Sequence, residues 1–211
     1  MLNMLARHTA SGGWINGFKV LGQGIDYHTP KNTGDTAEEI YAELISGKIV
    51  LMDLSSGEQF LKEHISRKVA GHILDRSIGV FTEGSAPAPI TIVVEEAHNV
   101  IEASLSLAEV WPKIAKEGAK YGIGLFAITQ EVSSLHKNVL AGCENWVVFH
   151  FNNKYEINCL CNYEDFEDFR KLIMADDVGH AVVRTFSRPI TIPAQIYEFK
   201  PEIPESGKEA A

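Results

Sequence analysis

Two adjacent glutamates follow a short apolar stretch near the middle of the chain. Residues 90–94, Ile-Thr-Ile-Val-Val, are followed directly by Glu95 and Glu96 and then by Ala97 and His98. The stretch predicts a strand, and ligands of open α/β sheets bind outside the carboxyl ends of the strands. Two carboxylates at that edge are suited to bind a metal ion or to act on a reacting water.

The two glutamates are expected to have different roles. Adjacent residues that leave a strand point to opposite sides, so Glu95 and Glu96 are not expected to share one task. One carboxylate can hold Mg²⁺ directly or through water, while its neighbour orients and deprotonates an attacking water. This division of roles is what nucleotide hydrolysis requires. The alternative is a solvated pair of acids at the end of a strand.

A second apolar stretch also ends in polar residues. Residues 123–128, Ile-Gly-Leu-Phe-Ala-Ile, are followed by Thr129 and Gln130. If this strand is the parallel neighbour of residues 90–94, Thr129 and Gln130 lie at the same sheet edge as the two glutamates. A glutamine there can sense a γ-phosphate or the water that attacks it. The alternative is an amide that hydrogen-bonds a loop.

The elements that must position these residues alternate along the chain. Short apolar runs alternate with stretches of helical periodicity, which predicts an α/β domain with a mainly parallel sheet covered by helices on both faces. A terminal hairpin is expected at the C-terminal end, with Pro193 on an edge strand because proline cannot donate to a ladder. The expected helices span residues 36–45, 60–79 and 103–121, the expected strands residues 49–54, 90–94, 123–128 and 146–149, and the hairpin strands residues 181–185 and 190–196.

The sequence predicts one domain, with a segment before it and a tail after it. A chain of 211 residues is long enough to bury a core without disulfides or metal. Frequent glycines predict an irregular N-terminal segment over residues 1–34. The core is expected over residues 35–200, with Asp35 or Thr36 capping its first helix and Gly47 ending it. Residues 201–211 are polar and predict a mobile tail.

Composition excludes several classes of function. The formal net charge of −9 does not favour binding of polyanions by the whole surface, so any DNA contact must be local. There is no apolar run of about 18 residues and no signal-peptide start, which favours a cytoplasmic protein without membrane contact. The three cysteines, Cys143, Cys159 and Cys161, form neither a disulfide framework nor a zinc pattern, and we assign them no chemistry.

Two other catalytic sites are poorly supported. Glu95 and His98 form one Glu-x-x-His motif, whereas carboxylate-bridged di-iron sites need two such motifs on facing helices. Ser55-Ser56-Gly57 lacks the first glycine of the nucleophile elbow of a serine hydrolase.

The glutamate and glutamine segments together resemble the Walker B and following region of ATPases of the HerA/FtsK type. The resemblance spans roughly residues 36–198. It is carried by the Glu-Glu-Ala-His run, by Glu-Gly-x-Lys-Tyr-Gly-Ile-Gly-Leu-x-x-x-Thr-Gln over residues 117–130, and by residues 48–55, 139–143 and 179–183 with Pro189. It implies part of a RecA-like P-loop NTPase core that uses ATP and Mg²⁺.

The resemblance assigns a role to each residue. Glu95 matches the Walker B acid associated with Mg²⁺, directly or through water, and Glu96 matches the catalytic base. Gln130 matches the catalytic sensor, with Thr129 beside it at the nucleotide, and His98 ends the motif. Asp53 could support the site or cap the following turn. The resemblance further implies a hexameric homo-oligomeric ring that moves duplex DNA, with a nuclease as a candidate partner in end resection, phage defence or restriction.

The chain departs from the family pattern at two points. It has no G-x-x-x-x-G-K-S/T motif, and in this superfamily the P-loop strand is central, between the strands matched by residues 123–128 and 146–149. The sequence therefore resembles the C-terminal part of an ATPase core that another segment completes. Ala119 stands where the family often has an arginine finger, for which Lys116, Lys120, Arg170 or Arg184 are candidate substitutes. These departures favour the alternative of an inactive module that serves assembly of a complex.

Three lysines form a candidate basic stripe. Lys113, Lys116 and Lys120 recur at near-helical spacing before the second strand, and they predict a surface for DNA or a neighbouring subunit. The alternative is a solvated helix face.

Overall fold

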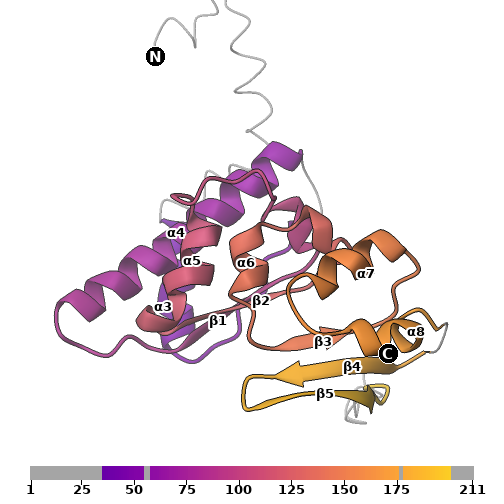
Figure 1. The fold of residues 1–211 in the computed structure, drawn as a ribbon. Helices are drawn as coiled ribbons and strands as arrows, with labels where there is room; N and C mark the ends of the chain where they lie inside the picture. The colour runs from indigo at the N-terminus through magenta and orange to yellow at the C-terminus, as the bar shows by residue number, and fades with distance from the viewer. Residues whose placement is uncertain (1–34, 55–57, 176–177, 201–211) are drawn as a thin grey trace, which may run out of the picture. The chain divides into compact units, whose positions relative to one another are not determined.

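The computed structural model describes residues 35–54, 58–175 and 178–200. The chain divides into two compact units, Met1–Glu39 and Ile40–Ala211. The predicted N-terminal segment 1–34 and the tail 201–211 lie outside the described residues. The fold below is that of the second unit, together with residues 35–39, where helix α3 begins (Figure 1).

Two helices precede the first strand. Helix α3, Thr36–Ile45, begins where the Asp35 carboxylate accepts a hydrogen bond from the Ala37 N–H at 3.1 Å. It ends before Gly47, whose φ of +84° is the left-handed conformation that glycine adopts freely. Helix α4, Gln59–Thr82, runs three residues beyond its predicted end and buries Ala70, Ile73 and Leu74.

The parallel strand pair of the predicted α/β fold is confirmed. Strands β1, Ile90–Val94, and β2, Ile123–Ala127, pair in parallel with Ile90 opposite Ile123 and Val94 opposite Ala127. Side chains alternate between the two faces of each strand, and the face that includes Ile90 and Ile123 packs into a hydrophobic core. Helices α4 and α5, Val110–Glu117, also line this core.

The opposite face of this sheet is exposed, which corrects the expectation of a sheet covered on both faces. Val93 and Phe126, the apolar residues of one paired row on that face, are 58% and 53% exposed. Parallel strands are seldom left uncovered, because their apolar side chains need a packed layer on each side. The described residues supply such a layer on one side.

The predicted strand over residues 49–54 is wrong. Residues 48–54 belong to no helix or strand, and Ile49 and Leu51 are 96% and 93% exposed. An apolar strand needs a neighbouring strand for its backbone groups and a second layer for its side chains. The described residues offer this run neither, so its apolar composition is not realised as a strand.

The predicted helical region 103–121 is shorter than expected. Residues 103–109 form turns, and the helical part comprises α5 and the 3₁₀ helix η3, Gly118–Tyr121. The Ser106 hydroxyl accepts the Ala108 N–H at 3.1 Å, a local bond that competes with helix formation. Pro112 lies in the first turn of α5, where its missing N–H costs little.

The C-terminal hairpin is confirmed, and it belongs to a second sheet. Strands β4, His180–Thr185, and β5, Arg188–Gln195, are antiparallel, and β4 also pairs with β3, Trp146–Val148. Strand β5 is at the edge and carries Pro193, as predicted. Within the described residues, β3 pairs with β4 and not with β2.

Short helices complete the fold and form a second core. Phe166, Ile157 and Leu160 are almost fully buried in it. No helix in the described ranges is both long and apolar enough to cross a membrane. The remaining elements are η2, Ala97–Asn99; η4, Val132–Ser134; α6, Lys137–Ala141; α7, Lys154–Cys161; η5, Glu167–Phe169; and α8, Arg170–Ile173.

Replacing Gly122 with alanine should destabilise the chain by about 1–3 kcal/mol. Gly122 precedes β2 with φ +74°, and a Cβ there would lie 3.1 Å from the Ala88 carbonyl oxygen. Gly79→Ala in α4 is the matched control, because an added Cβ meets no atom within 4 Å, and it should be neutral or stabilising by about 0.5–1 kcal/mol. Urea denaturation measures both, and equal effects would contradict the strain argument.

Candidate functional site

The parallel pairing continues past the ends of β1 and β2. The Ile128 N–H donates to the Val94 carbonyl at 2.9 Å, and the Ala97 N–H donates to the Ile128 carbonyl at 2.8 Å. These two bonds hold the residues after each strand side by side. The structure thus brings the glutamate pair and the Thr129-Gln130 pair together at one sheet edge, where the sequence placed them.

Glu96 has an unusual backbone and a well-defined carboxylate. Its φ and ψ are both 47°. Among the residues that the structure describes, Glu96 is the only non-glycine residue with a positive φ. A left-handed conformation costs an L-residue roughly 1–2 kcal/mol, and such strain concentrates at functional sites. Glu96 Oε1 accepts a hydrogen bond from Gln130 Nε2 at 3.0 Å. The predicted base and the predicted sensor are therefore in direct contact.

His98 contacts both halves of the site. Its Nδ1 lies 3.0 Å from Thr129 Oγ1 and 3.5 Å from Glu96 Oε2. Sequence reasoning gave His98 no contact beyond its place at the end of the motif. The expected parallel pairing of the two strands was a partial signal, but the left-handed turn at Glu96 that brings His98 to Thr129 follows from no local pattern.

Glu95 is exposed at the same edge, and its carboxylate makes no hydrogen bond within the described ranges. Mg²⁺ commonly binds one or two carboxylates and completes its coordination with water and substrate phosphates. A single exposed carboxylate beside Glu96 fits that pattern. No group of three histidine, cysteine, aspartate or glutamate side chains in the described ranges is arranged to hold a metal by itself.

Asp53 does not lie at a strand end. It is exposed in the irregular run 48–54, so the expectation that it supports the site from a neighbouring strand is not met.

The candidate arginine fingers are engaged within the chain. Arg170 Nε lies 2.7 Å from Glu167 Oε2, and Arg184 Nε lies 3.0 Å from Glu164 Oε1. Ala119, at the position of the family's arginine, is exposed. An arginine held in such a pair must first exchange partners before it can reach a nucleotide on a neighbouring subunit.

The three lysines do not form one uniform stripe. Lys113 and Lys116 lie on α5, and Lys116 is exposed. Lys120 lies on η3, with its Nζ 5.0 Å from the ring centre of Phe81 and 5.2 Å from that of Tyr121. These cation–π contacts give Lys120 a local packing role.

The cysteines remain without assigned chemistry. Burial raises the pKa of the Cys143, Cys159 and Cys161 thiols above the ordinary value. A raised pKa disfavours the thiolate, which is the reactive form of cysteine.

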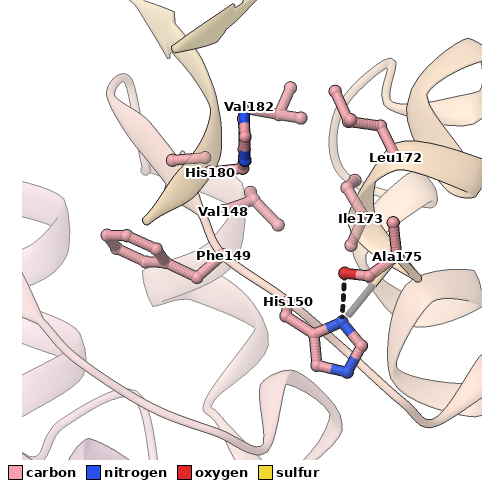
Figure 2. A pocket seen from close by; sticks show the side chains of 9 residues that line it. Val148, Phe149, His150, Leu172, Ile173, Ala175, His180 and Val182 are labelled. Atoms are coloured by element: carbon pink, nitrogen blue, oxygen red, sulfur yellow. Dashed lines mark hydrogen bonds between the residues drawn. The ribbon is translucent and has the colours of Figure 1, made fainter. Parts of the chain in front are cut away.

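A small pocket lies elsewhere, between α8 and strands β3 and β4 (Figure 2). His150 borders it and lies with Nδ1 2.9 Å from the Ala175 carbonyl oxygen. None of its lining residues is one of the predicted site residues. The candidate site is instead an open sheet edge.

Comparison with known proteins gives related sequences and related folds. No protein-family model matches the chain. A DNA double-strand break repair helicase HerA from Sulfurisphaera tokodaii is 27% identical over 162 residues, 70% of this chain and 31% of that protein. The HerA of Saccharolobus solfataricus is 24% identical over 175 residues, 78% of this chain and 35% of that protein. The chain spans about a third of the length of these relatives.

Solved structures of a viral packaging enzyme resemble this chain. The genome packaging NTPase B204 from Sulfolobus turreted icosahedral virus 2, in complex with ATP-gammaS, matches with a TM-score of 0.55 and 12% identity over 75% of this chain and 72% of that one. Its complex with sulfate gives a TM-score of 0.57 over 84% and 78%. At this identity the likeness establishes the fold alone, which this chain shares with that packaging NTPase.

Proposed function

Because this chain is homologous to part of the HerA helicases and has the fold of a P-loop packaging ATPase, we propose that it is the Walker B and sensor half of an ATPase. The observation that carries the proposal is the bond between Glu96 and Gln130 at adjoining strand ends. A sheet edge with no chemistry to perform has no physical need for two adjacent acids, one of them in a strained conformation.

Each residue then has a chemical role. Glu96 accepts the proton of the attacking water, and Gln130 fixes that carboxylate and orients the water. Each carboxylate oxygen of Glu96 has two lone pairs and only one neighbouring nitrogen among these contacts. Each oxygen therefore retains a lone pair for that water. Glu95 holds Mg²⁺, directly or through water, and Thr129 lies beside the nucleotide. When bound with ATP, Mg²⁺ neutralises charge that develops on the phosphates.

A P-loop segment completes the site, because the sequence of this chain has no G-x-x-x-x-G-K-S/T motif. In the described residues β2 pairs only with β1, and β3 pairs only with β4. One edge of each strand is therefore open to a further strand, and the exposed row of Val93 and Phe126 is open to a further layer. We place the P-loop strand between β2 and β3 and its helix over this row.

Replacing Phe126 with aspartate tests this placement. Phe126 is exposed in this chain, so the variant should fold as the unchanged chain does. In a protein joined to its P-loop segment it should lower stability by at least about 2 kcal/mol, because an apolar contact is lost and a charge is buried. Thermal unfolding of both forms measures this, with Phe186→Asp, 72% exposed in the turn after β4, as the control. Equal stability of the two joined variants would contradict the placement.

The finer proposal is a ring, hexameric in the family it resembles, that couples ATP hydrolysis to movement of duplex DNA. The net charge of −9 requires a local DNA contact, for which Lys113 and Lys116 on α5 are the candidates. A nuclease partner, in end resection, phage defence or restriction, extends the same proposal. This proposal is tested by measuring ATP turnover with duplex DNA of increasing length and at increasing salt concentration, since phosphate contacts weaken steeply with salt.

The second candidate is a module without catalytic activity that supports assembly of a complex. The absence of a P-loop motif, Ala119 in place of the arginine, and the ion pairs of Arg170 and Arg184 favour it. This candidate predicts that turnover stays absent with every DNA and after completion by a P-loop segment. DNA-stimulated turnover excludes it.

A further inference from the structure

We propose that His98 is a positioning residue that holds the Glu96 carboxylate through the proton on its Nδ1. The tautomer is inferred from the contacts of Nδ1, whereas the effect on hydrolysis rests on the proposed function. His98 follows Glu96 by two residues and reaches Thr129, which lies 31 residues further along the chain.

Hydrogen-bond accounting at Thr129 assigns the proton. The Thr129 hydroxyl has one hydrogen, which the Glu131 carbonyl oxygen at 3.2 Å is placed to accept. The same oxygen accepts the Glu131 N–H at 3.0 Å. With its hydrogen on that carbonyl, the hydroxyl oxygen meets His98 Nδ1 at 3.0 Å as an acceptor, and we infer that Nδ1 carries the proton.

The second neighbour of Nδ1 supports the same assignment. Glu96 Oε2, at 3.5 Å, is an acceptor when the carboxylate is ionised. The Nδ1–H thus lies between two acceptors, one on each of the two adjoining strand ends. An unprotonated Nδ1 would set its lone pair against the carboxylate oxygen Glu96 Oε2, which is unfavourable at this partly buried position, where the His98 side chain is 18% exposed.

This arrangement places the Glu96 carboxylate between two donors. Gln130 Nε2 holds Oε1, and His98 Nδ1 lies against Oε2. The two donors come from both sides of the sheet edge, so the rotation of the carboxylate is restricted. The strained backbone of Glu96 is then compensated by contacts that aim its side chain.

The tautomer can be measured on the full chain by nitrogen-15 NMR of the histidine rings above pH 8, where an ordinary histidine is neutral. We expect His98 to be protonated at Nδ1, and Thr129→Val to shift the population toward the Nε2-protonated form. His64, exposed on α4, serves as the reference ring. A His98 ring protonated at Nε2 in the unchanged chain would overturn the proposal.

The effect on turnover is tested by a matched pair in the protein completed by its P-loop segment. The side-chain nitrogen of asparagine is separated from Cα by the same number of bonds as Nδ1 of histidine. The side-chain nitrogen of glutamine is separated from Cα by the same number of bonds as Nε2 of histidine. His98→Ala should lower kcat about 10-fold with little change in KM, the usual cost of removing an orienting partner. His98→Asn should restore most of that loss, and His98→Gln should not.

The outcomes separate the two proposals. Equal turnover in the asparagine and glutamine variants would overturn the positioning role of Nδ1, as would unchanged kcat in His98→Ala. Absence of turnover in the completed, unsubstituted protein would refute the proposed function, and the NMR experiment would still decide the tautomer. His64→Asn, a histidine substitution on the surface of α4, should leave turnover unchanged.

Discussion

Glu96→Gln should lower ATP turnover of the protein completed by its P-loop segment by about 10²–10⁴-fold, the usual contribution of a general base. Glutamine keeps the length of the side chain and an oxygen that can accept from Gln130 Nε2, the partner of Glu96 Oε1 at 3.0 Å. It cannot accept the proton of the attacking water. The geometry of the site should therefore survive while its chemistry is lost.

Nucleotide binding provides the second readout for this variant. Affinity for ATP with Mg²⁺ should change little, because the phosphates are held by the P-loop segment and the metal by Glu95. Glu144→Gln, an exposed carboxylate outside the site, is the matched control and should retain full turnover. Turnover within a few-fold of the unsubstituted protein would remove Glu96 from the role of base.

Phe166→Ala should destabilise the chain by about 3–5 kcal/mol, the range for truncating a large buried aromatic residue. Phe166 is fully buried in the second core with Ile157 and Leu160. Its ring also packs edge-on against Trp146, with 6.2 Å between ring centres. Because a domain is typically stable by only about 5–15 kcal/mol, this loss should leave the chain close to unfolding.

Urea denaturation provides the measurement for Phe166→Ala. The midpoint should fall while the slope of free energy against urea stays constant. Phe186→Ala is the matched control, because Phe186 is exposed and its loss should cost less than about 0.5 kcal/mol. Similar midpoints for the two variants would contradict the assignment of Phe166 to the core that supports β3 and β4.

The sheet edge of the candidate site was predictable because its signal is local. Residues 90–94 and 123–128 form short, largely apolar runs that are followed by polar residues, and this pattern identified both the strands and the edge where they meet. The hairpin was predictable for a similar reason, since a turn separates its two strands directly.

The failures of prediction concern features that depend on distant partners. Residues 49–54 have the composition of a buried strand, but a strand forms only where another strand and a second layer receive it. The contact of His98 with Thr129 depends on the left-handed turn at Glu96 and on the registration of two strand ends, which no local pattern specifies. The late start of the helical region, at Val110 instead of residue 103, depends on a hydroxyl that competes for one backbone N–H.

The most direct test of the account compares Mg²⁺-dependent ATP hydrolysis by this chain alone and by the same chain completed by its P-loop segment. We expect no turnover by the chain alone, because its sequence has no G-x-x-x-x-G-K-S/T motif, and steady turnover by the completed protein, which Glu96→Gln lowers by about 10²–10⁴-fold. A completed protein that is folded and binds ATP with Mg²⁺, yet hydrolyses none, would contradict the account and favour a module that serves assembly.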